Sequence, residues 1–209
     1  MKAIKHSWVP GSLAVLLLLS GCVKLWQESL DIKTYLIEAR REGGSAQTAL
    51  APKLWIDSVT VLPPYNMRGL VLRKSDVEFT ASYYTELLMS PSENIRNELY
   101  MWLSTSGLFE DVSIVNRAGK SHSLHVTVME FYGDATSQEA VLTVKATLID
   151  DRTKEVGVVF SNDYRRRIAV SDNSADELIR AYNVALGGIL SDLERDMGEA
   201  VGHYSGSAD

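Results

Sequence analysis

The sequence predicts an α+β fold, a single domain in which one mixed or mostly antiparallel sheet carries two main helices packed on one face. Three observations support this prediction. Several short runs rich in Val, Ile and Leu alternate with polar residues at a period of two, as half-buried strands do. Two longer stretches carry apolar residues at helical spacing behind capping signals. Helices are few and the strands mostly follow one another, in the order strands, helix, several strands, helix.

Residues 1–21 have the layout of a cleaved secretory signal peptide. Lys2, Lys5 and His6 form a basic start, and Leu13–Leu19 forms the apolar stretch. That stretch is too short to cross the ~30 Å hydrocarbon core of a bilayer, which takes about 20 apolar residues. We therefore expect the leader to be removed.

The leader ends at Leu19–Cys22, which reads Leu-Ser-Gly-Cys and is typical of a bacterial lipobox. Cleavage before Cys22 would leave its sulfur to carry a diacylglycerol and its amine to carry an acyl chain. An ordinary signal peptide followed by a chance cysteine is the alternative. Cys22 is the only cysteine in the chain, so its thiol has no disulfide partner. Two or more acyl chains anchor a protein stably, whereas one does so only marginally.

The mature chain would be acidic. Removing 21 residues, among them two lysines and no acid, would lower the formal charge from −6 to −8. Such a chain is a poor candidate for binding nucleic acid, and it gains no electrostatic attraction to an anionic membrane. Val23 follows the cysteine where inner-membrane lipoproteins of enteric bacteria typically have Asp, which favours the outer membrane.

The mature chain divides into a short tether, one domain and a tail. We expect residues 22–31 to be the lipidated tether, residues 32–198 the folded domain and residues 199–209 a flexible tail. Nine extended tether residues reach about 30 Å. Within the domain, Ile32–Glu38 reads as a first strand and residues 39–52 as a loop.

The next elements are a strand, a hairpin and a helix. Leu54–Leu62 reads as a strand that Pro63 and Pro64 end, because proline cannot donate to a ladder. Leu70–Arg73 and Val77–Ala81 read as a hairpin. A helix is predicted to begin after Ser90, which can cap it, with Pro91 in the first turn and Glu93 completing a capping box. Its apolar face is Ile95, Leu99, Trp102 and Leu103, and Gly107 ends it.

The second half predicts more strands and one long helix. Strands are expected at Val112–Val115, around Leu124–Val128, at Leu142–Leu148 and from Val156 to Arg167. Ser174 and Glu177 cap the last helix, whose apolar side is Leu178, Tyr182, Ala185, Ile189, Leu193 and Met197. Gly187 and Gly188 lie inside that helix and predict either close approach of a neighbouring backbone or a bend. The tail from Gly198 is expected to fray.

The sequence shows no complete pattern for a catalytic, metal or phosphate site. His122 and His125 point to opposite faces of a strand and are poor partners for one metal ion. Asp150–Asp151 and Glu110–Asp111 read as solvated turns or strand edges rather than catalytic pairs. The chain has no nucleophile elbow and no phosphate-binding glycine loop. Arg165–Arg167 is either a solvated strand end with local ion pairs or a contact for headgroups or an acidic partner.

Three tyrosines are candidates for a protein interface, where tyrosine is enriched. They are Tyr65, Tyr83 and Tyr84. Their placement in the core is an equal alternative from the sequence alone.

Four stretches of the mature chain resemble the ABC-type transport auxiliary lipoprotein family, and within it the PqiC-like group associated with MCE-type transport systems. The similarity runs from Thr34 to Met197 and is carried by Thr34–Ile37, then Ile56–Val61, Pro63, Tyr65, Arg68, Val71 and Arg73, then Tyr84, Glu86 and Leu88, and finally Leu124–Val128 with Phe131. Tyr84 stands where the family usually has tryptophan, and Leu87 where it often has proline. These departures indicate a divergent member.

The resemblance implies a non-enzymatic lipoprotein without a cofactor, held on the periplasmic face of the outer membrane by lipid on Cys22. It implies docking of the periplasmic MCE-type subunit of an envelope transporter for lipids or hydrophobic compounds, and assembly of copies into a ring. The candidate interface residues are Tyr65, Arg68, Arg73 and Tyr84. The alternative is a periplasmic lipid carrier or envelope-assembly lipoprotein with an internal apolar cavity of a few hundred Å³.

Overall fold

The computed structural model describes residues 32–41, 49–152 and 157–205, without the side chains of residues 203–205. The predicted leader, Cys22, the tether and the last four residues lie outside the described residues.

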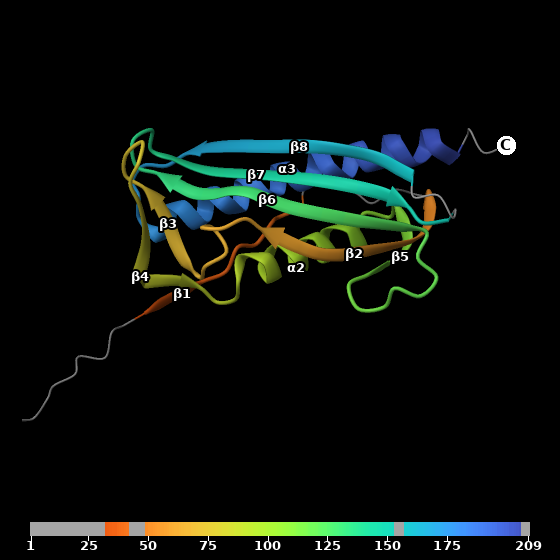
Figure 1. Cartoon of the computed structure of the whole chain (residues 1–209), viewed down its shortest axis with the longest axis horizontal. Helices are drawn as coiled ribbons and strands as arrows, with labels where there is room; N and C mark the ends of the chain where they lie inside the picture. Colours follow the sequence, from red (N-terminus) through yellow and green to blue (C-terminus); the bar gives the residue numbers. More distant parts are fainter. Residues whose placement is uncertain (1–31, 42–48, 153–156, 206–209) are drawn as a thin grey trace, which may run out of the picture. The chain divides into compact units, whose positions relative to one another are not determined.

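The described chain folds into eight strands and two helices (Figure 1). The strands are β1 Lys33–Tyr35, β2 Ala51–Val61, β3 Gly69–Arg73, β4 Phe79–Leu87, β5 Phe109–Ser113, β6 His122–Asp134, β7 Glu139–Asp150 and β8 Gly157–Ala169. The helices are α2 Pro91–Ser104 and α3 Ala175–Ser205. The predicted α+β class and the mixed sheet are confirmed.

Strand β6 organises the sheet. One of its edges pairs antiparallel with β7, which pairs antiparallel with β8. The other edge is shared, because the first half of β6 pairs with β2 and its last two residues pair with β3, both parallel. Beyond β2 lies β5, and beyond β3 lie β4 and β1. The sheet is therefore split on one side into two short wings.

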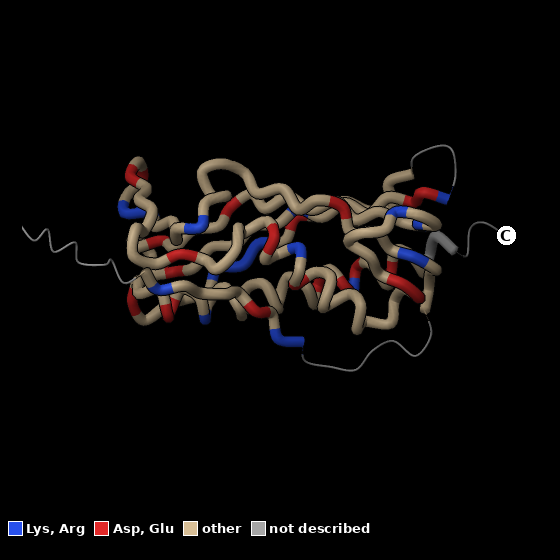
Figure 2. Tube along the Cα trace, turned by 90° about the horizontal axis from the view of Figure 1, so that it is seen from below, with Lys and Arg blue, Asp and Glu red and all other residues tan. Residues whose placement is uncertain are grey.

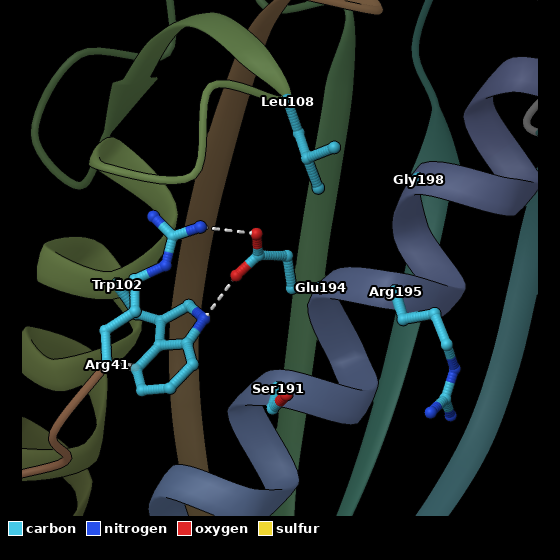
Figure 3. Close-up of a pocket in the computed structure, with 7 residues that line it drawn as sticks. All are labelled: Arg41, Trp102, Leu108, Ser191, Glu194, Arg195 and Gly198. Carbon is cyan, nitrogen blue, oxygen red and sulfur yellow. Dashed lines mark hydrogen bonds and ion pairs between the residues drawn. The ribbon is translucent and has the colours of Figure 1, made fainter. Parts of the chain in front are cut away.

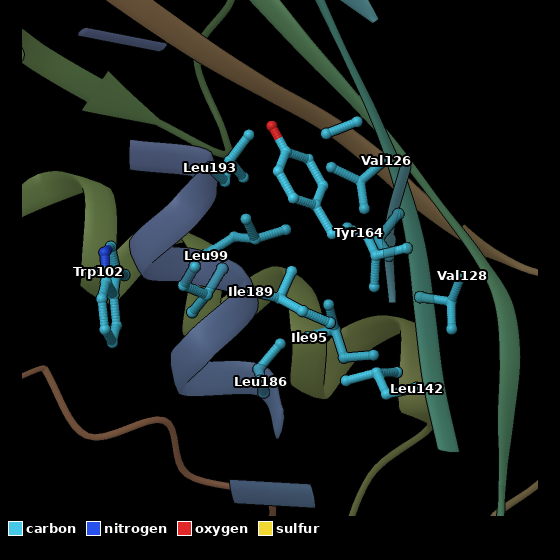
Figure 4. Packing of buried hydrophobic residues seen from close by; sticks show 14 of the residues in the cluster. Ile95, Leu99, Trp102, Val126, Val128, Leu142, Tyr164, Leu186, Ile189 and Leu193 are labelled. Atoms are coloured by element: carbon cyan, nitrogen blue, oxygen red, sulfur yellow. The ribbon is translucent and has the colours of Figure 1, made fainter. Parts of the chain in front are cut away.

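Both helices cover the same face of the sheet, as predicted. Apolar residues of α2 and α3 join one cluster with inward-facing residues of β2, β6, β7 and β8. Figure 4 shows Ile95 and Leu99 of α2 and Ile189 of α3 directed toward the sheet side chains. The rings of Phe131 and Tyr182, 4.5 Å apart between centroids, pack at this boundary.

Helix α2 begins where the capping signal predicts. The Ser90 side chain accepts from the Glu93 N–H, the Glu93 carboxylate accepts from the Ser90 N–H, and Pro91 occupies the first turn. The expected apolar face of α2 is buried, from Ile95 to Leu103. The capping box is confirmed.

Helix α3 is longer than predicted. It continues past Gly198 to Ser205, so the prediction of a frayed tail from Gly198 is wrong over these residues. Val201 lies one turn beyond Met197 and is 2% exposed, so its burial extends the apolar side of the helix. A Cβ at Gly187 would lie 3.6 Å from the Arg40 carbonyl oxygen, which confirms the predicted approach of a neighbouring backbone.

Two predicted strands end at least two residues earlier than expected. The first strand covers only Lys33–Tyr35, because the backbone of Ile37–Ala39 bonds to side chains of the helices instead of to a strand. The strand expected at 112–115 ends at Ser113, whose Oγ accepts from the N–H groups of the next residues and turns the chain away. As a result, Val115 is exposed.

Candidate functional site

An aromatic cluster lies on the face of the sheet that the helices leave uncovered. We define the aromatic cluster as Tyr65, Phe79 and Tyr132. The Tyr65 and Tyr132 rings stack with centroids 5.8 Å apart, and Phe79 meets Tyr132 edge-on at 5.7 Å. Buried Val71 and Val141 support the cluster from β3 and β7. Tyr65 comes from the loop after the two prolines, so that turn delivers it to this face.

The cluster remains partly open to solvent. Phe79 is 43% exposed and Tyr65 is half-buried. The pKa of Tyr65 is raised, because burial and the neighbouring Tyr132 and Glu130 disfavour the phenolate more than the Arg73 guanidinium favours it. Protein interfaces are enriched in aromatic residues and arginine, and both are present here.

Arg73 lies beside the cluster with its charge compensated. Its guanidinium pairs with Asp76 at 2.8 Å and with buried Asp134 at 3.4 Å, and its Nε donates to the Ser75 carbonyl. Burial opposes the ionisation of Asp134, but hydrogen bonds from Thr136 and Ser137 and the Arg73 charge outweigh it. The pKa of Asp134 is therefore held below its usual value. Arg73 and Asp134 are therefore held as an ion pair where β3 and β6 end.

Arg68, just before β3, contacts strand β4, and Tyr84 is a residue of that strand. The Arg68 Nε donates to the Leu87 carbonyl at 2.8 Å and its terminal nitrogen pairs with Glu86 at 3.1 Å. Tyr84 is 60% exposed. The structure thus places the four predicted interface residues in two groups, with Tyr65 and Arg73 at the aromatic cluster, and Tyr84 on β4 with Arg68 against the end of that strand.

The three arginines of β8 are engaged in ion pairs. Arg165 pairs with Glu130 at 3.1 Å, Arg167 pairs with Glu139 at 2.8 Å, and Arg166 pairs with Asp192 of α3. The interpretation of a strand end with local ion pairs is confirmed. Figure 2 shows acidic and basic residues interspersed along the described chain.

The two histidines do not converge on one site. His122 is buried beside Phe109 and contacts the Ser121 hydroxyl through Nδ1, whereas His125 pairs with Asp57 at 3.1 Å. No group of three or more potential metal ligands occurs among the described residues. Glu110 and Asp111 are exposed on β5 rather than on a turn.

The prediction that Asp150 and Asp151 form a solvated turn is wrong. Asp150 is 2% exposed, and Arg152 folds back onto it at 2.8 Å. Asp151 accepts from Lys120 at 2.9 Å and from Ser123. Asp150 is buried and Asp151 half-buried because both lie against β6, and no local sequence pattern predicts that position.

A pocket of about 280 Å³ lies between α2, α3 and the segment that follows β1 (Figure 3). Glu194 bridges its walls, accepting from the Trp102 indole N–H at 2.7 Å and from Arg41 at 2.7 Å. Leu108, Ser191, Arg195 and Gly198 complete the lining. The pocket is open and its charged groups are ion-paired, Arg41 with Glu194 and Arg195 with acids outside the pocket. It therefore offers neither the apolar enclosure of an acyl-chain site nor an unpaired catalytic group.

A family model described as the ABC-type transport auxiliary lipoprotein component matches residues 35–193. The chain belongs to this family. The family's description makes the protein a lipoprotein component that is auxiliary to ABC-type transport. The match begins within β1 and ends in α3, so it contains the aromatic cluster and every predicted interface residue.

Solved structures share the fold of this auxiliary lipoprotein. Protein XCC0632 from Xanthomonas campestris aligns with a TM-score of 0.70 at 14% identity, covering 85% of this chain and 100% of that one. The hypothetical protein CT253 from Chlamydia trachomatis aligns with a TM-score of 0.50 at 9% identity, covering 70% of this chain and 98% of that one. No curated protein matches the chain. Neither helix in the described part of the auxiliary lipoprotein is long and apolar enough to cross a membrane.

Proposed function

We propose that the mature protein is a lipid-anchored, non-catalytic component of an envelope transporter, which docks the periplasmic MCE-type subunit to the outer membrane. The observation that carries this proposal is the family match over residues 35–193, preceded at short distance by the Leu-Ser-Gly-Cys sequence. The transported compound would be a lipid or another hydrophobic molecule, and loss of the protein would weaken the membrane barrier.

Lipid on Cys22 would supply the localisation. An S-diacylglycerol and an N-linked acyl chain such as palmitate give the stable anchoring that one chain does not. Val23 in the following position supports sorting to the outer membrane, at its periplasmic face. The protein then needs no membrane-spanning segment to remain at the membrane.

The aromatic cluster with Arg73, together with Arg68 at β4, would supply recognition. Tyr65 and Phe79 expose part of their rings beside Arg73, and buried Tyr132 packs against both rings. Arg68, which is half-exposed, lies in the second group at β4. A partner that covers these groups needs to bury only ~800 Å² per side for a specific complex. Assembly of several copies into a ring would multiply such contacts and raise the avidity for the transporter.

The absence of catalysis is part of the proposal. The acids and bases of the described sites are paired with one another, as Glu194 is with Arg41 and Asp134 is with Arg73. The core between sheet and helices is occupied by large side chains such as Tyr182 and Leu186, which are 1% exposed each. These observations argue for docking over carriage of a lipid in an internal cavity.

Site-specific photocrosslinking tests the proposed surface in cells. A photoreactive phenylalanine analogue replaces Tyr65, and the matched control carries it at Val184, an exposed position on α3 (62% exposed). We expect position 65 to crosslink to the MCE-type subunit and position 184 not to. Recovery of no transporter subunit at position 65, or the same product at both positions, would contradict the proposed surface.

A further inference from the structure

Tyr83 and Tyr84 are consecutive, exposed residues on a bulge of strand β4. Tyr83 is 88% exposed and Tyr84 is 60% exposed. The pairing of β3 with β4 skips here, since Gly69 pairs with Glu86 while Val71 already pairs with Ala81. Residues 82–85 therefore lie opposite a single residue of β3 and form a bulge in that pairing.

The bulge is held in place by its own hydrogen bonds. The Ser82 hydroxyl accepts from the N–H groups of Tyr84 at 3.3 Å and Thr85 at 3.1 Å. On β3, Gly69 makes room for it, because a Cβ there would lie 2.6 Å from the Ser82 carbonyl oxygen. The two rings are thus presented on a fixed element rather than on a loose loop.

The chain from the lipid arrives at this bulge. Strand β1 pairs parallel with the end of β4, and Lys33 lies opposite Thr85. Because the pairing is parallel, the residue before Lys33 comes alongside the residue before Thr85, so Ile32 enters the domain next to Tyr84. Ile32 is itself 45% exposed.

The length of the tether limits how far this end can lie from the bilayer. Nine residues separate Cys22 from Ile32, and an extended chain of nine residues spans at most about 30 Å. Tyrosine is the residue type that, with tryptophan, gathers at the headgroup level of membranes, because its ring is apolar and its hydroxyl is polar. Lys33, exposed beside the bulge, adds a positive charge suited to phosphate headgroups.

We propose that Tyr83 and Tyr84 insert into the headgroup region of the bilayer that holds Cys22, so that the bulge is a second membrane contact of the domain. This inference rests on the proposed lipidation of Cys22. The lipid would hold the protein on the membrane, and the bulge would fix the orientation of the domain against it. The aromatic cluster on the uncovered sheet face would then be presented to a periplasmic partner in a constant direction.

A spin label tests the contact on the full lipidated protein. Tyr83→Cys introduces a free thiol in a chain whose own cysteine is alkylated, and Val115→Cys is the matched control, because Val115 is also 88% exposed and lies after β5. Both proteins are reconstituted in vesicles of phosphatidylethanolamine and phosphatidylglycerol. Relaxation of the label by oxygen, which partitions into lipid, is compared with relaxation by a water-soluble nickel chelate. Tyr84→Cys repeats the measurement if the first variant does not fold.

We expect the label on the bulge to be relaxed several-fold more by oxygen, relative to nickel, than the label at position 115. If both proteins float with the vesicles and both labels are equally accessible to nickel, the bulge contact is overturned while the anchor stands. Shielding at position 83 that depends on added transporter subunit rather than on lipid overturns the contact in favour of a protein partner. If neither protein floats, the anchor fails and the inference fails with it.

Discussion

The side-chain amide of Asn94 forms two hydrogen bonds with the backbone of Ile37. The Ile37 N–H donates to Asn94 Oδ1 at 3.0 Å, and Asn94 Nδ2 donates to the Ile37 carbonyl at 2.8 Å. Both residues are 1% exposed. Asn183 of α3 accepts from the Glu38 N–H, and Glu98 of α2 accepts from the Ala39 N–H. Side chains of both helices therefore bind the backbone of the segment that follows β1.

Replacing Asn94 should destabilise the domain. Asn94→Ala leaves one buried N–H and one buried C=O without partners, and we expect it to lower the free energy of unfolding by about 2–4 kcal/mol. Chemical denaturation followed by circular dichroism measures this change. Asn97→Ala, at an exposed position of the same helix, is the control and should change stability by less than about 0.5 kcal/mol. Equal losses of stability in the two variants would show that the hydrogen bonds between Asn94 and Ile37 contribute little to the stability of the domain.

Adding a methyl group at Gly69 should disturb the bulge. The new Cβ would sit 2.6 Å from the Ser82 carbonyl oxygen, which is backbone and cannot move aside cheaply. We expect Gly69→Ala to cost about 1–3 kcal/mol in thermal or denaturant unfolding. The same substitution at Gly202 of α3 meets nothing within 4 Å and should stabilise the helix by up to ~1 kcal/mol. A neutral Gly69→Ala would contradict the close approach of the two strands.

The ion pair in the pocket should stabilise the packing of the N-terminal segment on the helices. Arg41 and Glu194 have side chains 16% and 21% exposed, so solvent screens their pair only partly. Glu194→Gln removes the charge and can still accept from the Trp102 indole, and we expect a loss of about 1–3 kcal/mol of stability. Glu199→Gln, on an exposed position of the same helix, should be nearly neutral. A Glu194 variant as stable as the Glu199 variant would show that the pair is not needed.

Stability should fall in mild acid because of His122. Burial lowers the pKa of His122, and the nearby Asp150 offsets this only in part. The folded state therefore takes up a proton less readily than the unfolded state, whose histidine titrates near 6.5. The stability that neutral, buried His122 contributes is fully present above about pH 6.5 and is lost as the pH falls toward the folded-state pKa. Denaturation between pH 5 and 8 should show a shallower slope for His122→Asn than for the natural chain, and parallel curves would contradict this origin.

Local patterns predicted the elements that local interactions build. The Ser90 cap with Glu93, the alternation around Leu124–Val128 and the hairpin between β3 and β4 were all readable, because each depends on residues close in sequence. The glycines inside α3 correctly predicted a close neighbour at Gly187.

Features that depend on distant partners were not predictable. The parallel pairing of β2 with both β5 and β6 joins strands far apart in the chain, and no local pattern specifies it. The burial of Asp150 depends on Arg152 folding over it, and the shortness of β1 depends on Asn94. For the candidate site, sequence named Tyr65 and Arg73, but Phe79 and Tyr132 became visible only when the sheet brought them together.

Mass spectrometry of the mature N-terminus tests the central claim most directly. Our account predicts that the first residue is Cys22, that its sulfur carries a diacylglycerol and its amine an acyl chain, and that Cys22→Ser abolishes both the modification and the membrane association. A mature chain that begins at another residue, or that begins at an unmodified Cys22, would contradict the account.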